Sequence, residues 1–210
     1  MKVNWNTTLH AITACATVLI AVTALLAFGF AERHIEQSEQ QARIEHLEAR
    51  IDDYESPRFV NIRKSLADQR IDPAEKRLRK IDPDDPPDPL IDELNFCDDL
   101  GLRVYRGDLN RHDVWDVFST WLFVLYRDAQ PAIDAARQKE GAAVFGDCTD
   151  LVESLKDIEV AENASPRMIH PSDDYIYRFY LSETNAQPGQ PPSKTRTRRI
   201  APEVPDDRKR

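Results

Sequence analysis

The sequence predicts an all-α protein: one N-terminal transmembrane helix that continues into a helical stalk, then a small helical bundle and a disordered C-terminal tail. Three observations predict this class. Residues 9–31 form an apolar run of 23 residues without Lys, Arg, Asp or Glu. The chain after it is highly charged, and its apolar residues recur at helical spacing. Strands would alternate apolar and polar residues, and no such alternation of any length occurs before residue 175.

Composition and spacing divide the chain into seven segments. They are a short N-terminal tail (1–8), the membrane helix (9–31), a helical stalk with a short helix (32–66), a Pro/Asp-rich linker (67–89), a helical core domain (90–162), an aromatic segment (163–185) and a disordered basic tail (186–210). The core segment is large enough for one modest hydrophobic core.

The run over residues 9–31 favours a membrane anchor. A helix of this length rises about 35 Å, more than the hydrocarbon core of about 30 Å. A removable secretory signal is the alternative, because residues 29–31 offer a passable cleavage site. Such signals have an apolar core of roughly 7–15 residues after a basic start, whereas here the run is longer and only Lys2 precedes it.

Basic residues near the two ends of the run predict its orientation. Lys2 and the amino terminus precede it, and Arg33, Arg43 and Arg50 follow it. Because the more basic flank stays in the cytosol, we expect a single-pass protein of the inner (plasma) membrane with its C-terminal domain in the cytosol. The margin is one or two residues.

The cysteines agree with that orientation. Cys15 lies inside the apolar run, and Cys97 and Cys148 are isolated residues without CxxC spacing. This pattern is typical of buried, reduced thiols in a cytosolic domain. A disulfide between Cys97 and Cys148 is the alternative for a domain outside the cytosol.

The stalk contains no Gly or Pro between residues 32 and 54 and is rich in helix-forming residues. Its apolar residues step by three, four and three, which is the seam of a coiled coil. Two interpretations stay open: a homodimer through the membrane helix and the stalk, or a stripe that docks on its own domain. Ser56-Pro57 ends the segment. The seam consists of Ile44, Leu47, Ile51 and Tyr54.

Helical periodicity and caps predict the elements after the stalk. The linker carries five prolines and is expected to hold at most one charged helical turn, around residues 75–80. Gly101 is expected to end the first core helix, and Asn110 to cap the next. The expected helices span 57–66, 90–100, 111–128, a segment starting at Pro131, and 147–162, with a turn at 141–146.

Aromatic residues mark the expected core. A helix that is apolar on nearly every face is typical of the centre of a bundle. The alternative is a ligand groove lined by the same rings: Trp115, Phe118, Trp121 and Phe123. Further along, alternation in Tyr175, Tyr177 and Phe179, followed by Tyr180, favours an extended strand that packs on its own domain, or else docks a partner strand or the membrane surface.

The segment from Leu94 to Gln138 resembles the bacterial family of membrane-anchored proteins with the domain of unknown function DUF4760. The resemblance implies one transmembrane helix and a helical domain, and it brings no catalytic residues to this sequence. The matching positions are Leu94, Phe96, Leu100, Gly101, Arg106, Gly107, Leu109, Val114, Phe118 and Tyr126.

The sequence contains none of the common catalytic or nucleotide-binding motifs, and we assign no catalytic, cofactor-binding or metal-binding residue. His112 and Asp116 are four residues apart on one helical face, which could place two ligands on a metal. The alternative, which we favour, is a capped helix start with solvated side chains. The cluster comprises Asp98, Asp99, Asp108, His112, Asp113 and Asp116.

The leading hypothesis is a non-enzymatic single-pass membrane protein that presents a small helical interaction or assembly domain to the cytosol. Its expected partners are the lipid bilayer and an unidentified protein; nucleic acid is not expected. The first alternative is a membrane-tethered, metal-assisted hydrolase that uses His112 and the nearby aspartates. The second is a tether to anionic lipid or nucleic acid through residues 186–210, which hold seven basic and three acidic residues in a chain of net charge −9.

Overall fold

The computed structural model describes residues 34, 38–163 and 169–186. They belong to two units, one up to Ile44 and one from Glu45 onward. In the first unit residues 38–44 are helical. The apolar run over 9–31 and the tail from residue 187 lie outside the described residues, and so do the predictions that depend on them. Among the helices that the structure describes, none is long and apolar enough to cross a membrane.

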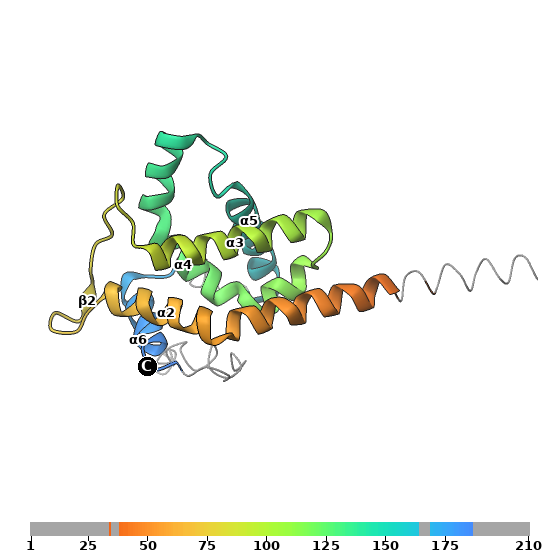
Figure 1. Ribbon diagram of the computed structural model, residues 1–210, viewed down its shortest axis with the longest axis horizontal. Coiled ribbons are helices and arrows are strands. Elements are labelled where there is room, and N and C mark those ends of the chain that lie inside the picture. Colours follow the sequence, from red (N-terminus) through yellow and green to blue (C-terminus); the bar gives the residue numbers. More distant parts are fainter. Residues whose placement is uncertain (1–33, 35–37, 164–168, 187–210) are drawn as a thin grey trace, which may run out of the picture. The chain divides into compact units, whose positions relative to one another are not determined.

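The described part of the second unit is mainly helical, as the sequence predicts (Figure 1). Residues 45–55 are helical, and a small hairpin interrupts the helices that follow. The elements are α2 (Pro57–Arg70), β1 (Ile71–Asp72), β2 (Arg77–Leu78), α3 (Asp88–Arg106), α4 (Arg111–Glu140), α5 (Gly146–Asn163) and α6 (Asp173–Glu183).

The apolar stripe of the stalk packs on its own domain. Tyr54 is buried, and Leu47 and Ile51 pack against the core cluster. These side chains are therefore unavailable for a coiled-coil seam, and the coiled-coil interpretation is not supported. Ser56 ends the stalk helix as predicted, and its hydroxyl accepts a hydrogen bond from the Phe59 N–H to cap α2.

The region after residue 66 is more ordered than predicted. The helix predicted over 57–66 extends to Arg70, because Leu66, Ala67 and Arg70 are all buried. A two-residue antiparallel hairpin then pairs Ile71 with Leu78, where the sequence allowed at most one helical turn. The Asp72 carboxylate accepts hydrogen bonds from the two N–H groups of the hairpin loop at residues 74 and 75, which favours a turn over a helix.

Gly101 does not end a helix. It lies inside α3, and α3 ends instead at Gly107, whose φ of 82° is the left-handed conformation of a C-cap. A Cβ atom at Gly101 would overlap the backbone carbonyl of Asp147 at the start of α5. The glycine is therefore needed for the close approach of two helices and not for backbone freedom.

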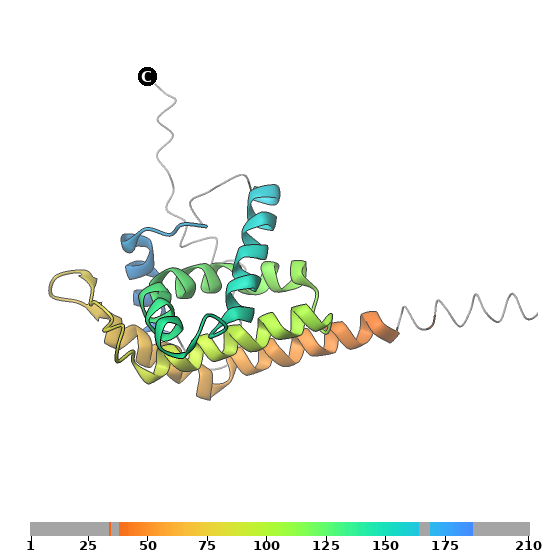
Figure 2. The ribbon, with the colours of Figure 1, turned by 90° about the horizontal axis from the view of Figure 1, so that it is seen from above.

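One helix, α4, replaces the two that were expected on either side of Pro131. It begins at the predicted cap, where the Asn110 side chain accepts from the His112 N–H, and continues through Pro131 to Glu140. Figures 1 and 2 show that its last turns run in a different direction from its first. Proline removes one helical hydrogen bond and bends a helix without ending it when both halves are packed.

The aromatic segment forms a helix, so the strand expected over residues 175–179 is wrong. The Ser172 hydroxyl caps α6 by accepting from the Tyr175 N–H, and two aspartates occupy the first turn. The helix buries residues at positions i, i+3, i+4 and i+7 against α2, α4 and the hairpin. It therefore packs on its own domain, the first of the alternatives stated above. The buried residues are Ile176, Phe179, Tyr180 and Glu183.

The core contains the predicted aromatic residues. Trp121 is 4 % exposed and lies edge-on to Tyr54, with ring centroids 5.2 Å apart. Phe118 and Phe123 are buried as well, and Trp115 is half-buried. Leu94 of α3 and Leu155 of α5 are fully buried, as their helical spacing predicts.

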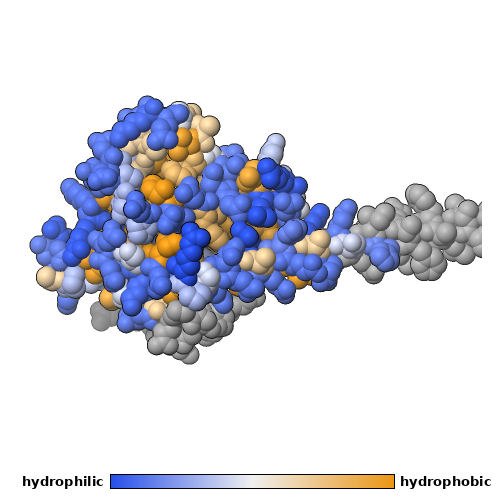
Figure 3. Space-filling model, in the orientation of Figure 1, coloured by the Kyte–Doolittle hydropathy of each residue, from blue (hydrophilic) through white to orange (hydrophobic). Residues whose placement is uncertain are grey.

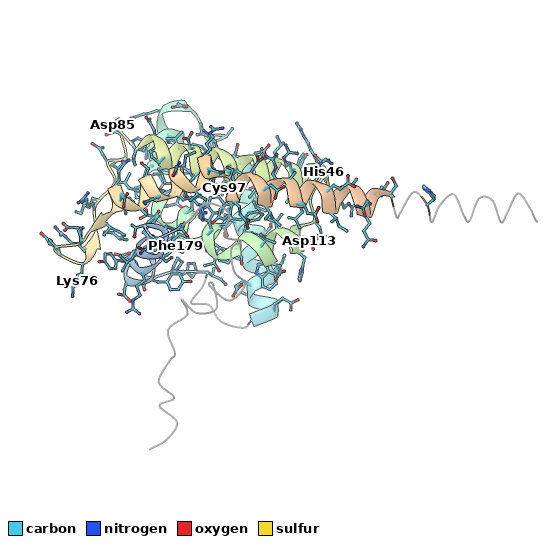
Figure 4. The ribbon with its side chains drawn as sticks, turned by 60° about the horizontal axis from the view of Figure 1, so that its bottom comes forward. His46, Lys76, Asp85, Cys97, Asp113 and Phe179 are labelled. Carbon is cyan, nitrogen blue, oxygen red and sulfur yellow. A yellow bond between two sulfur atoms is a disulfide. The ribbon has the colours of Figure 1, made fainter. Side chains whose placement is uncertain are left out.

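The two cysteines of the domain are joined, so the prediction of reduced thiols is wrong. Cys97 of α3 and Cys148 of α5 form a disulfide with a Cα–Cα distance of 5.1 Å, and both residues are completely buried. Figure 4 labels Cys97 where α3 lies among the other helices. The spacing of the cysteines in the sequence could not reveal this pairing, because it depends on how α3 packs on α5.

Candidate functional site

Two aspartates of the predicted cluster, Asp98 and Asp99, bind neighbouring elements of the domain. Asp98 of α3 accepts a hydrogen bond from the backbone N–H of Cys148, 3.0 Å away. Asp99 accepts from Arg50 at 3.0 Å and from Arg103 at 2.9 Å. These contacts fix α3 to the stalk helix and to the first turn of α5. None of these contacts of Asp98 and Asp99 involves His112.

His112 lies in an exposed corner. Its Nε2 atom is 3.6 Å from a carboxylate oxygen of Glu162, and its ring lies edge-on to Trp115. Asp113 and Asp116 are exposed on the same helix. Within the described residues no group of three or more His, Cys, Asp or Glu is arranged to hold a metal ion. The geometry therefore gives the hydrolase hypothesis no support.

A second set of ionisable residues, which sequence reasoning missed, is buried between the helices. Arg70 at the end of α2 binds Asp128 of α4 through two parallel hydrogen bonds of 2.8 and 2.5 Å. The Tyr180 hydroxyl of α6 donates a third bond to Asp128 at 2.9 Å. Such a bidentate pair is among the strongest polar contacts in proteins. It joins three helices at one carboxylate.

A second buried contact lies on the same side of α2, about two turns before Arg70. Arg63 donates to the Tyr54 hydroxyl at 2.8 Å and is 3.0 Å from a carboxylate oxygen of Glu183. Arg63 and Arg70 are seven residues apart, so they lie on the same side of α2. That spacing, on the side that also buries Phe59 and Leu66, is the sequence signal that could have found them.

Within the described part of the chain, Glu93 is a buried carboxyl with a hydrogen-bond partner on only one of its two oxygens. Its Oε2 atom accepts from the Trp121 indole N–H at 2.9 Å, and its Oε1 atom has no hydrogen-bond partner among the described residues. Burial raises the pKa of Glu93 to about 8, although the Trp121 hydrogen bond and the charge of Arg63 oppose the rise. Burial therefore favours the uncharged form of the Glu93 carboxyl, and the carboxylate that faces Arg63 at 3.0 Å is that of Glu183.

The family model for DUF4760, a domain of unknown function, matches residues 11–154, more than half of the chain. The chain belongs to the DUF4760 family. This confirms the resemblance that residues 94–138 suggested. No curated protein and no solved structure matches the chain.

The DUF4760 match begins inside the apolar run and ends within α5. It contains Arg63, Arg70, Glu93 and Asp128, but α6 lies beyond it. The buried contacts thus combine residues inside the matched region with Tyr180 and Glu183 from outside it. These contacts join the helices of the domain.

A surface cavity of about 450 Å³ lies between α4, α5 and the start of α6. Among its lining residues, Arg127 and His170 are exposed, and Lys156 pairs with Glu153 at 2.6 Å. Phe123 and Tyr126 form part of its apolar wall. The cavity is therefore a partly apolar pocket with polar side chains among its lining residues.

Proposed function

We propose that this DUF4760 protein is a single-pass membrane protein whose helical domain serves as an interaction or assembly module. The observation that supports this is the use of the buried ionisable groups. Arg63, Arg70 and Asp128 bind partners on neighbouring helices, and these contacts join the helices into one compact unit. A domain built in this way presents a fixed surface to a partner.

The anchor rests on the run over residues 9–31. Its length and lack of charge favour a membrane span, and the family match begins at residue 11, inside it. Most of the run therefore lies in the same family match as most of the helical domain, which supports a module that works beside a bilayer.

The surface of the domain offers few apolar side chains. On the face in Figure 3, hydrophilic side chains predominate and hydrophobic ones form small patches between them. Tyr105, near the end of α3, is 85 % exposed, the largest exposed fraction of any large hydrophobic residue in the described part. Tyrosine is enriched where proteins meet, because it offers a large apolar area and a hydrogen-bonding hydroxyl.

Site-specific photo-crosslinking tests this proposal. A photoreactive phenylalanine analogue replaces Tyr105 in the full chain, expressed in its own membranes. The matched control places the analogue at Lys76, an exposed position at the hairpin tip (Figure 4). We expect discrete protein adducts from position 105 that position 76 does not give. Equal adducts from both positions, or none from either, would contradict the proposal.

A further inference from the structure

The geometry of the Cys97–Cys148 disulfide points to the side of the membrane on which the domain lies. We propose that the helical domain faces the non-cytosolic side, where dithiols are oxidised. The inference rests on the membrane anchor of the proposed function. It is opposite to the orientation that the flanking arginines predict.

Three features of the α3–α5 contact bring the two cysteines together. Gly101, one turn after Cys97, has no side chain and allows the first turn of α5 to approach α3. The Asp98 carboxylate accepts from the backbone N–H of Cys148 and fixes that turn in place. The two Cα atoms are then 5.1 Å apart, within the range that a disulfide spans.

The disulfide is protected once it has formed. Both cysteines are completely buried in the core cluster, so a dissolved thiolate cannot reach either sulfur atom in the folded domain. It also connects residues 51 positions apart, and a crosslink that closes a long loop stabilises the fold by restricting the unfolded chain. These properties are those of a permanent structural bond, in contrast to exposed bonds that act as redox switches.

Formation of this bond requires an oxidant. The Cys97 and Cys148 thiols together give up two protons and two electrons, and a disulfide of a thiol–disulfide exchange protein accepts them to become a dithiol. Such exchange runs toward oxidation in compartments outside the cytosol, whereas cytosolic thiol systems keep cysteines reduced. A buried structural disulfide therefore favours a domain that folds outside the cytosol.

The charge difference that predicts the opposite orientation is small. Lys2 and the amino terminus give two positive charges before the apolar run, against three arginines within twenty residues after it. A difference of one charge gives little bias. The disulfide is thus the stronger of the two indicators.

The cysteine state is tested in the full chain carrying Cys15→Ser, expressed in its own membranes. Cells are quenched in acid, the protein is denatured, and free thiols are alkylated with a maleimide that adds visible mass. We expect no added mass before reduction and two additions after it. The control, Cys97→Ala in the same background, should take one addition without reduction. Two additions to the Cys15→Ser chain without reduction would overturn the inference.

A reporter enzyme that is active only outside the cytosol, fused after Arg210, tests the side directly. We expect activity; a silent fusion that is present at normal level would overturn the inference. Carbonate extraction separates this result from the anchor. If the protein is extracted while the disulfide and the reporter activity persist, the proposed membrane anchor fails and the non-cytosolic location stands.

Discussion

The protonation of Glu93 predicts how the stability of the domain depends on pH. This carboxyl is buried between α3 and α4, with one hydrogen bond from Trp121. Its pKa in the folded protein is about 8, against 4.5 for an exposed glutamate. Between these two values the folded chain holds a proton that the unfolded chain has released.

The sign follows from proton linkage. Because folding raises the pKa, the stabilisation is fully present below pH 4.5 and is lost as the pH rises through about 8. At about 1.4 kcal/mol for each tenfold change in proton affinity, the full difference is on the order of 5 kcal/mol. Relaxation of the site and water entry at high pH reduce this figure, so we expect a measured loss of about 2–4 kcal/mol.

This loss is measured by urea unfolding of the full chain in detergent at several pH values between 5 and 9. Tryptophan fluorescence reports the unfolding transition. Glu93→Gln keeps an oxygen to accept the Trp121 hydrogen bond and removes the ionisation. We therefore expect the variant to lose much less stability than the parent between pH 5 and pH 9. Glu153→Gln, at an exposed carboxylate that pairs with Lys156, is the matched control and should follow the parent.

The reasoning is refuted if the parent and the Glu93→Gln variant show the same dependence on pH. It is also refuted if the parent gains stability from pH 5 to pH 9 relative to this variant, because that sign would mean a carboxylate stabilised by its neighbours. Either result would mean that the Glu93 carboxyl is ionised in the native state at neutral pH.

Three further predictions concern packing. In urea unfolding, Trp121→Ala should lower the free energy of unfolding by about 3–5 kcal/mol, because the indole is buried. His112→Ala should lower it by less than about 1 kcal/mol, because the imidazole is exposed. Gly101→Ala should delay or prevent disulfide formation, because the added Cβ atom would overlap the Asp147 carbonyl. The control, Gly146→Ala, adds a Cβ atom with no atom within 4 Å and should be tolerated, and thiol alkylation distinguishes the two variants. Deletion of residues 186–210 should leave the unfolding transition unchanged, because the Pro-rich, charged composition of this segment predicts a tail that adds little to the core, and a shift of the midpoint would contradict it.

Helical periodicity was sufficient to locate most of the core. Leu90, Leu94 and Leu100 on α3 and Leu151 and Leu155 on α5 are buried as their spacing predicts. The prediction was poorest where local signals compete. The alternating tyrosines of residues 175–180 resemble a strand, yet the Ser172 cap and the aspartates after it begin a helix, and burial at i, i+3, i+4 and i+7 stabilises it.

The remaining differences arise from tertiary contacts. Gly101 resembles a helix terminus in sequence, and only the approach of Asp147, 46 positions later in the numbering, shows that it is a packing glycine. The pairing of Cys97 with Cys148 has the same origin. The spacing of Arg70 on α2 indicates that it is buried, but nothing in the local sequence shows that its partner is Asp128, 58 residues away. Periodicity shows which face of a helix is buried and not which residue of another helix it meets.

The position of α6 has a consequence for how the family unit is defined. Asp128 lies inside the matched region and accepts hydrogen bonds from Arg70, also inside it, and from Tyr180, beyond it. Arg63, inside the matched region, likewise forms an ion pair with Glu183, beyond it. A buried cation that loses its carboxylate costs several kcal/mol, so residues 11–154 alone would leave Arg63 without the carboxylate it faces in this fold. The helix after the matched region is therefore an integral part of the domain in this chain, and the stable unit extends at least to Glu183.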